Sequence, residues 1–174
     1  MNTRAAGLLV ALGACLTLPA VPASAQENTA LEVQVGTGAP RRLGAAELAA
    51  LPQADIVETR KVGSGDTKQS EEVRWRGVLL RDVLDAAGMQ SLDRYALRRS
   101  AVVARATDNY AALFSWGELF NARLGEKVLV VTAMNGRPLP ASEGPYALRS
   151  LSDTKSGPRH VKWLRRLEVL TVAK

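Results

Sequence analysis

Cysteine and histidine are almost absent from this sequence. Its 174 residues include one cysteine, Cys15, and one histidine, His160. A zinc site needs three or four nitrogen, sulfur or carboxylate ligands and a disulfide needs two cysteines, so the sequence predicts neither. A catalytic triad of Ser156, His160 and Asp153 is also disfavoured, because residues this close in a Gly-Pro turn rarely converge as the mechanism requires.

Signatures of nucleotide and nucleic-acid binding are missing as well. There is no Gly-rich phosphate loop of Walker or Rossmann type, no internal repeat and no low-complexity run. Trp75, Trp116 and Trp163 form no stripe on which bases could stack, so we expect them in the core or at a pocket rim. The adjacent Glu71 and Glu72 stand in a polar loop region, which favours a solvated charge pair over an acid/base dyad. We therefore expect no nucleic-acid partner.

The first 25 residues have the pattern of a secretory signal peptide. Arg4 supplies a positive charge, residues 7–18 form an apolar run, and the small residues at 23–25 (Ala-Ser-Ala) form a cleavage site. The apolar run is too short to span a membrane. We expect cleavage after Ala25 and a periplasmic or secreted product that has no transmembrane segment after processing.

A second processing site remains open, because residues 12–15 (Leu-Gly-Ala-Cys) resemble a lipobox. Cleavage there would leave a lipoprotein anchored through Cys15. The apolar stretch that continues to Ala25 favours soluble processing, which removes the only thiol from the mature chain. The leader has a single arginine and not an Arg-Arg pair, which implies export as an unfolded chain without a preloaded cofactor.

The remaining 149 residues, 26–174, are expected to form a single domain. The hydrophobic content of 47% is enough for a core. The net charge of the whole sequence is +6, and the leader contributes only Arg4 to it. A basic exported domain of this kind favours anionic partners.

Hydrophobic patterning predicts an α+β domain. Residues 79–87 have apolar side chains at the i, i+3, i+4, i+7 spacing of one helix face, and Gly88 follows as a C-cap. Ser115 and Glu118 have the spacing of a capping box at the start of another helix. Asp108 and Asn109 suit a hairpin turn. The other expected elements are a helix over residues 43–51, strands over 31–35, 56–61, 73–75, 101–107, 110–114, 127–134 and 164–172, and a flexible loop over 63–70.

Basic side chains are concentrated between residues 137 and 166. We expect the turn at 156–158 (Ser-Gly-Pro) to bring Arg149, His160 and Lys162 to a common hollow, together with Arg159. Such a group of donors suits a phosphate or carboxylate, and a solvated basic face is the alternative that these residues leave open. The basic residues of the segment are Arg137, Arg149, Lys155, Arg159, Lys162, Arg165 and Arg166, and the acidic ones are Glu143 and Asp153.

Five short motifs follow one another over roughly residues 43–169. The most complete is Met-Asn-Gly-Arg-Pro-Leu-Pro at 134–140. In this order they resemble the sulfite oxidase-like, molybdopterin-binding oxidoreductase domain, and the resemblance implies that fold, a mixed β-sheet with short helices. The other four are Trp-Arg-Gly-Val-Leu-Leu at 75–80, Asp-Asn-Tyr at 108–110, Tyr-Ala-Leu-Arg-Ser-Leu at 146–151 and Val-Lys-Trp-Leu at 161–164.

The resemblance also implies roles for individual residues. Arg149 and Lys162 match positions that help hold the pterin phosphate in cofactor-carrying members. The cysteine that binds molybdenum should lie before Trp75, but this sequence has Glu-Thr-Arg at 58–60 and then a Gly/Ser loop. Residues 150–153 also depart from the apolar run of the family. The departures predict that molybdenum chemistry is absent.

We therefore expect an exported binding or accessory protein whose cofactor-binding positions are Arg149, His160 and Lys162. Its ligand would be a small anion or a pterin-like molecule, and a periplasmic protein is a second kind of partner. We expect no resident cofactor, no metal and no catalytic residue. Two alternatives stay open: a molybdopterin-dependent periplasmic oxidoreductase, and an envelope interaction protein anchored through lipid on Cys15.

Overall fold

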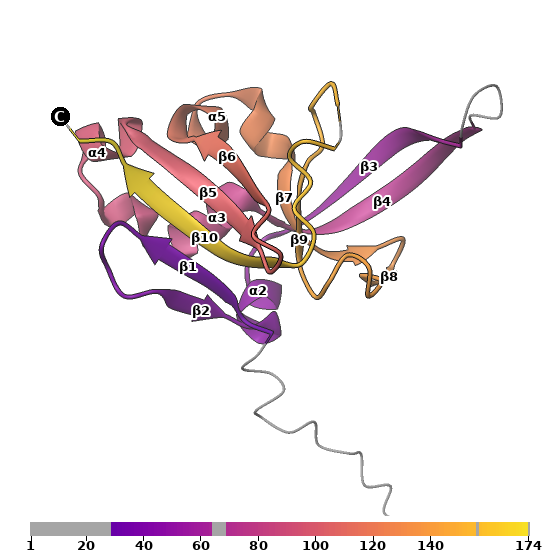
Figure 1. Ribbon diagram of the computed structural model, residues 1–174, viewed down its shortest axis with the longest axis horizontal. Helices are drawn as coiled ribbons and strands as arrows, with labels where there is room; N and C mark the ends of the chain where they lie inside the picture. The colour runs from indigo at the N-terminus through magenta and orange to yellow at the C-terminus, as the bar shows by residue number, and fades with distance from the viewer. Residues whose placement is uncertain (1–28, 64–68, 156, 174) are drawn as a thin grey trace, which may run out of the picture.

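Two β-sheets form the framework of this protein (Figure 1). The computed structural model describes residues 29–63, 69–155 and 157–173. The predicted leader with Cys15 lies outside these residues, as does most of the predicted loop at 63–70.

The first sheet has the strand order β2-β1-β10-β5-β6. Strands β1 and β10 are parallel, and the other neighbours are antiparallel. The strand predicted over 164–172 forms as β10 and lies inside the sheet, between β1 and β5. The strands are β1 (Leu31–Val35), β2 (Arg41–Leu43), β5 (Ser100–Ala106), β6 (Ala111–Ser115) and β10 (Leu164–Thr171).

The second sheet has the order β3-β4-β7-β8, and β9 also pairs with β7. The apolar segment at 127–134 was predicted to be a strand, and β7 confirms this. It is central in the sheet, because it has β4 on one side and β8 and β9 on the other. The strands are β3 (Gln53–Val62), β4 (Gln69–Leu79), β7 (Val128–Met134), β8 (Arg137–Pro138) and β9 (Ala147–Ser150).

Short helices accompany the two sheets, and this combination confirms the predicted α+β class. The capping box is present: Ser115 Oγ accepts from the Glu118 amide at 3.2 Å, and the Ser115 amide donates to Glu118 Oε2 at 2.7 Å. Leu43 was expected in the first helix but belongs to β2, since it pairs with Leu31 and the helix begins after Gly44. The helices are α2 (Ala45–Ala50), α3 (Leu80–Ala86), α4 (Arg94–Arg98), α5 (Trp116–Phe120) and the 3₁₀ turns η2 (Met89–Ser91) and η3 (Arg123–Lys127).

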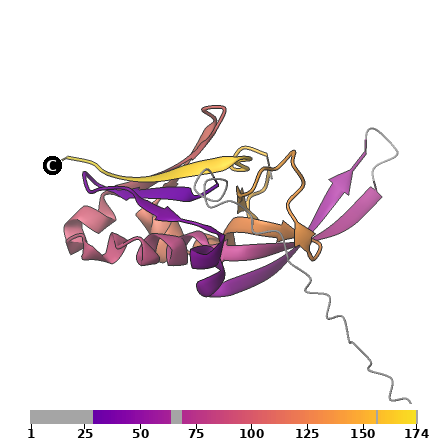
Figure 2. The same cartoon turned by 90° about the horizontal axis from the view of Figure 1, so that it is seen from below.

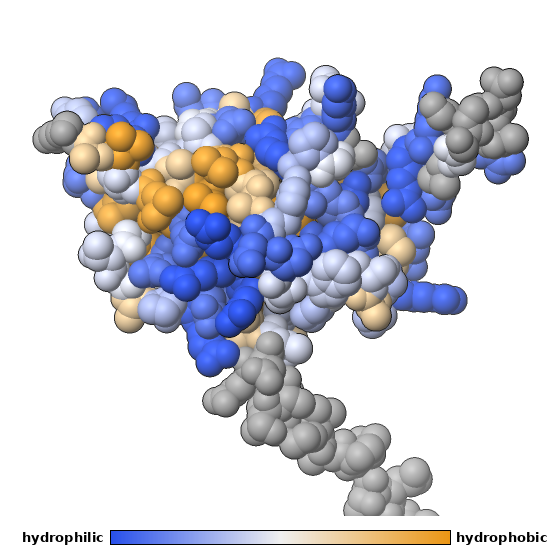
Figure 3. All heavy atoms as spheres, in the orientation of Figure 1, coloured by the Kyte–Doolittle hydropathy of each residue, from blue (hydrophilic) through white to orange (hydrophobic). Residues whose placement is uncertain are grey.

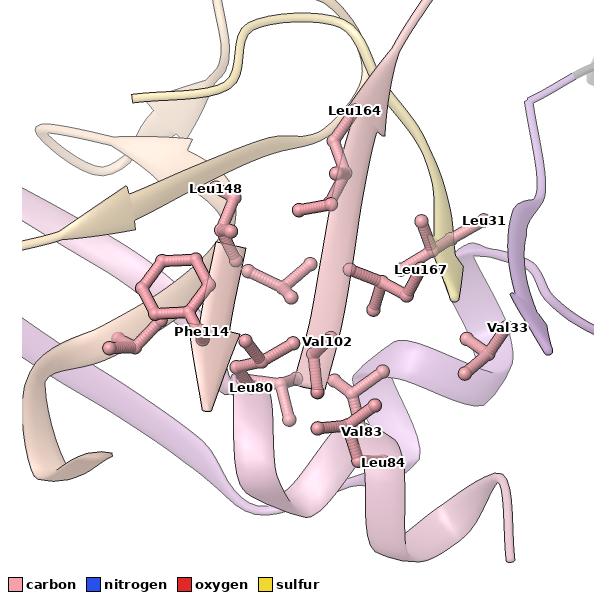
Figure 4. Packing of buried hydrophobic residues seen from close by; sticks show 14 of the residues in the cluster. Leu31, Val33, Leu80, Val83, Leu84, Val102, Phe114, Leu148, Leu164 and Leu167 are labelled. Atoms are coloured by element: carbon pink, nitrogen blue, oxygen red, sulfur yellow. The ribbon is translucent and has the colours of Figure 1, made fainter. Parts of the chain in front are cut away.

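The main core lies between the first sheet and the helices. Leu80, Val83 and Leu84 of α3 are fully buried, and Figure 4 shows them against Val102 of β5 and Leu167 of β10. The apolar spacing predicted for this helix is therefore the face that packs on the sheet. Figure 2 shows the helices gathered on one side of that sheet.

The opposite face of the first sheet is partly apolar. Leu113 of β6 is 61% exposed and Leu170 of β10 is 51% exposed. Figure 3 shows hydrophobic side chains gathered on this face beside a strongly polar region.

The β3–β4 hairpin extends beyond the body of the molecule as an arm (Figures 1 and 2). At its base, Trp75 is buried in a second small core with Val73 and Leu129. Gly77 permits a close approach there, because a Cβ on it would lie 2.0 Å from the Val130 carbonyl oxygen. The base of the arm is thus clamped to β7, and β3 forms the edge of the sheet.

No helix in the described part of the chain is long and apolar enough to cross a membrane.

Candidate functional site

Arg149 lies near the base of the arm, on β9, where it pairs with Leu129 of β7. It is one of the few buried charged residues, with 5% of its surface exposed. Its guanidinium carbon lies 4.3 Å from the ring centre of Trp75, over the indole face. Stacking of this kind suits a guanidinium because the group is planar and only weakly hydrated.

Glu58 faces this guanidinium from β3. Its Oε2 accepts a hydrogen bond from Arg149 Nη2 at 3.1 Å and a second from the Trp75 indole Nε1 at 2.8 Å. Both charged side chains are shielded, at 6% exposure for Arg149 and 13% for Glu58. The strand register supports the contact, because Glu58 pairs with Val73 and Ile56 pairs with Trp75 across the arm.

His160 connects Arg149 to a second carboxylate. Its Nε2 lies 2.6 Å from Glu143 Oε2, and its Nδ1 lies 3.1 Å from Arg149 Nη1. Arg149 can only donate, so Nδ1 must accept, and Nε2 then carries the proton and donates to Glu143. The two neighbours therefore define a neutral imidazole. Burial, and next the charge of Arg149, hold the pKa of His160 below its ordinary value, while Glu143 opposes the shift.

Lys162 lies next to Glu143 on the solvent side of these residues. Its Nζ lies 3.2 Å from Glu143 Oε1, and its side chain is 44% exposed. We call Glu58, Arg149, His160, Glu143 and Lys162 the charge cluster. Two cations, two carboxylates and a neutral imidazole give it no net charge.

A hollow of about 380 Å³ opens beside the charge cluster. His160 and Lys162 contribute to its wall, and so do two aromatic residues, Tyr110 at 44% exposure and Trp163 at 38%. Arg149 does not line it. The described residues of its wall, here called the Lys162 cleft, are Asp108, Tyr110, Gly157, His160, Lys162 and Trp163.

The backbone around Trp163 is held in an uncommon conformation. Trp163 has φ 45° and Gly144 has φ 85°. A Cβ on Gly144 would lie 2.5 Å from the indole Cδ1, so glycine is required for this contact. The indole Nε1 donates to the Ala141 carbonyl at 3.0 Å. Trp163 is therefore fixed as a wall between the Lys162 cleft and a hollow of about 410 Å³ on its other side, next to β1.

The predicted basic hollow forms only in part. His160 and Lys162 line one cleft, and Arg149 contacts His160 from the buried side. Arg159 was expected in the same hollow but is held elsewhere. Its Nε donates to Asp153 at 2.8 Å, its Nη1 to Glu118 at 2.9 Å, and its guanidinium lies over Phe114.

The triad considered from the sequence does not form around Asp153. That carboxylate accepts from Ser150 and Arg159, while His160 faces Glu143. Ser156 lies outside the described residues. Among the residues that are described, no three histidine, cysteine or acidic side chains are placed to hold a metal ion.

Glu58 and Glu143 are the two members of the charge cluster that the sequence did not predict. Glu58 was noted only as the residue standing where a cysteine was expected, and Glu143 only as a charge in a basic segment. The excess of basic residues could have pointed to them. An arginine that is buried needs an acidic partner, so a carboxylate should have been sought for Arg149.

One mixed and one antiparallel sheet with short helices define an α+β domain whose site gathers basic residues near an aromatic cleft. A model of the oxidoreductase molybdopterin binding domain matches residues 18–174, and the chain belongs to this family. The predicted resemblance and fold are thereby confirmed.

The sulfane dehydrogenase SoxCD of Paracoccus pantotrophus has a similar structure, with a TM-score of 0.62 and 16% identity. The match covers 83% of this chain and 39% of that one, so the chain spans well under half the length of its structural neighbour. A search of curated proteins found no match.

The charge cluster does not fit the phosphate of the cofactor for which this family is named. Glu58 already occupies Arg149, and both side chains are shielded from solvent. A phosphate on Arg149 would approach this carboxylate, and like charges in a shielded site repel strongly. The residues present at these positions therefore do not suit the molybdenum cofactor.

Proposed function

We propose that this protein is an exported binding or accessory member of its family, which holds a small anion in the Lys162 cleft and performs no molybdenum chemistry. The single observation that carries this proposal is the neutral charge cluster. Within the cluster, Glu58 pairs with Arg149, whereas Lys162 stays half-exposed beside the cleft.

The wall of the cleft suggests the shape of the ligand. Tyr110 and Trp163 present aromatic surface, and Lys162 presents an ammonium group that can donate to a carboxylate, sulfate or phosphate oxygen. Tyr110 is fixed by donating its hydroxyl to the Pro158 carbonyl at 2.7 Å. A small anion with a flat apolar part would use both kinds of surface.

Calorimetric titration of the mature protein with phosphate, sulfate, sulfite and an aromatic carboxylate such as benzoate tests the proposal. A charge-assisted hydrogen bond contributes about 1.5–3 kcal/mol when shielded, and the exposure of Lys162 places its contribution at the lower end. We expect Lys162→Ala to weaken binding about tenfold. The matched control is Lys61→Ala, an exposed lysine on the arm, which should leave binding unchanged.

Two results would contradict this function. Equal binding of the anions by wild type and Lys162→Ala would place the ligand elsewhere. No binding by any of them at low salt, where screening is weakest, would remove the small-anion proposal and favour a protein partner.

One rival function has support of its own. Family membership favours a molybdopterin-dependent oxidoreductase that is loaded after export. The pairing of Arg149 with Glu58 argues against it, because the cofactor phosphate would have to displace a carboxylate that already has two donors.

A further inference from the structure

We propose that Glu58 acts as a built-in anion: its carboxylate occupies a site on Arg149 that would otherwise bind a small oxyanion, so the domain carries its own counter-ion. The proposal concerns the buried side of the charge cluster. It shares the Arg149–Glu58 pair with the proposed function, but its test does not depend on ligand binding in the Lys162 cleft.

Arg149 carries its positive charge into the interior of the protein. An arginine stays protonated under all ordinary conditions, so a guanidinium with 6% exposure needs an anion or it destabilises the fold. Glu58 is the carboxylate at salt-bridge distance, at 3.1 Å. Its neighbour His160 is neutral and contributes no negative charge.

Two rigid donors shape the site that receives the Glu58 carboxylate. Trp75 stacks on the guanidinium and also donates its indole N–H to Glu58 Oε2. One oxygen therefore accepts from two rigid donors on different groups. Arg149 and Trp75 belong to β9 and β4, which both pair with β7, so these donors are fixed by the sheet. Oxyanions such as formate and phosphate present the same acceptor atoms as a glutamate side chain.

Glu58 reaches the two donors from a separate strand. It enters from β3, the edge strand of the arm, and it can be shortened without touching the two donors. The Arg149 Nε atom is buried and has no hydrogen-bond partner in the described structure, so the guanidinium retains capacity for another acceptor oxygen. Removal of the Glu58 carboxylate should thus create an anion site and not merely a hole.

The test is chemical rescue, measured as thermal unfolding of the mature protein. We expect Glu58→Ala to lower the melting temperature by roughly 10 °C, because it leaves an unpaired buried cation. Sodium formate at about 100 mM should then raise the melting temperature of this variant by about 4 °C, if formate binds with a dissociation constant near 10 mM. Sodium chloride at equal ionic strength should not.

The matched control is Glu71→Ala on the same hairpin. Glu71 pairs with Arg60 in the open, at 46% and 36% exposure, so its loss should change the melting temperature by no more than about 2 °C and formate should add nothing. Glu58→Gln fills the same space without charge, so it should be destabilised but not rescued. This variant keeps the proposal testable if Glu58→Ala fails to fold.

Three outcomes would overturn the proposal: Glu58→Ala or Glu58→Gln as stable as wild type, equal effects of formate on Glu58→Ala and Glu71→Ala, or rescue of Glu58→Gln. Repeating the rescue in Glu58→Ala with Lys162→Ala separates the two proposals. Rescue that persists there comes from Arg149, whereas loss of anion binding by Lys162→Ala alone bears only on the cleft.

Discussion

The protonation state of His160 follows from its two neighbours. Arg149 supplies a donor to one ring nitrogen, and Glu143 accepts from the other. A second proton on the ring would place an N–H opposite the Arg149 guanidinium, so two donors and two positive charges would face each other. Lys162 lies near the same carboxylate and adds to the repulsion. The neutral form is therefore part of the folded structure.

This arrangement predicts a loss of stability in mild acid. The unfolded chain takes up a proton on histidine near pH 6.5, whereas the folded chain resists because the pKa of His160 is lowered. The free energy of unfolding should thus be independent of this group above about pH 7.5 and fall as the pH drops from 7 towards the lower, folded pKa. Thermal unfolding between pH 7.5 and 5 measures the loss of stability, and NMR titration of the single imidazole measures the pKa of His160 in the folded protein.

The control for this prediction is His160→Gln, whose side chain can also accept from Arg149 and donate to Glu143. The variant should lose the slope between pH 7 and 5. Glu118 and Asp153 also have lowered pKa values. Each is protonated only below its usual range, so the stability that these carboxylates contribute is lost at a lower pH than that of His160. A histidine that titrates at or above pH 6.5 in the folded protein would disprove the assignment.

The cationic and histidine side of the charge cluster could be predicted from sequence, and the acidic side could not. Arg149, His160 and Lys162 stand in motifs close to one another along the chain. Glu58 lies 91 residues before Arg149, and their contact depends on strand pairing that no local pattern reveals. A carboxylate in an alternating polar strand resembles any solvated charge until its partner across the sheet is known.

At the scale of elements, burial determines which segments a sequence reveals. The helix α3 was predicted almost to the residue, because its apolar spacing faces the core. The strands of the arm were predicted too short. Residues 69–72 of β4 are exposed on both faces and carry no hydrophobic alternation, and residues 53–55 and 76–79 at the base of the arm were also missed. Residues such as Ser70, Glu71 and Glu72 form a strand through hydrogen bonding with β3 alone.

Gly77 provides the sharpest test of how the arm is attached. A methyl group at this position would lie 2.0 Å from a backbone oxygen of β7, beside the bulge between Arg76 and Gly77. We expect Gly77→Ala to reduce the free energy of unfolding by about 3 kcal/mol, because backbone must move to admit the methyl group. Denaturant titration measures the change.

Gly117→Ala is the matched control for Gly77→Ala. A Cβ there would meet only the Ser115 hydroxyl, at 3.9 Å, and the residue is helical. We expect this variant to be neutral or slightly more stable, because alanine reduces the freedom of the unfolded chain. Equal effects at both positions would show that the close approach at β7 is relaxed in solution.

At the scale of the whole molecule, the basic charge of the sequence is distributed in two ways. Within the charge cluster it is cancelled, and elsewhere exposed residues such as Lys61 and Lys155 remain in solvent. The cancelled part stabilises the fold, and the solvated part governs encounter with anionic partners. The net charge of +6 therefore does not measure the strength of the candidate site.

The predicted processing and the proposed lack of a cofactor can be tested on one sample. Protein purified from its native envelope should have the mass of residues 26–174 without acyl chains, since the cleavage site ends at Ala25. Native mass spectrometry and elemental analysis should find no pterin and no molybdenum. Acyl chains on Cys15 would establish the lipoprotein alternative, and stoichiometric molybdenum would replace the proposed function with the oxidoreductase.

The place of β10 in the first sheet has a consequence for when this chain can fold. Strand β1 pairs with β10 and not with β5, and β10 joins the two. A growing or emerging chain that lacks residues 164–171 therefore has no partner for the inner edge of either strand, and contacts this distant in sequence close late. The first sheet can therefore be completed only once residues 164–171 are available, which is compatible with the proposed export as an unfolded chain.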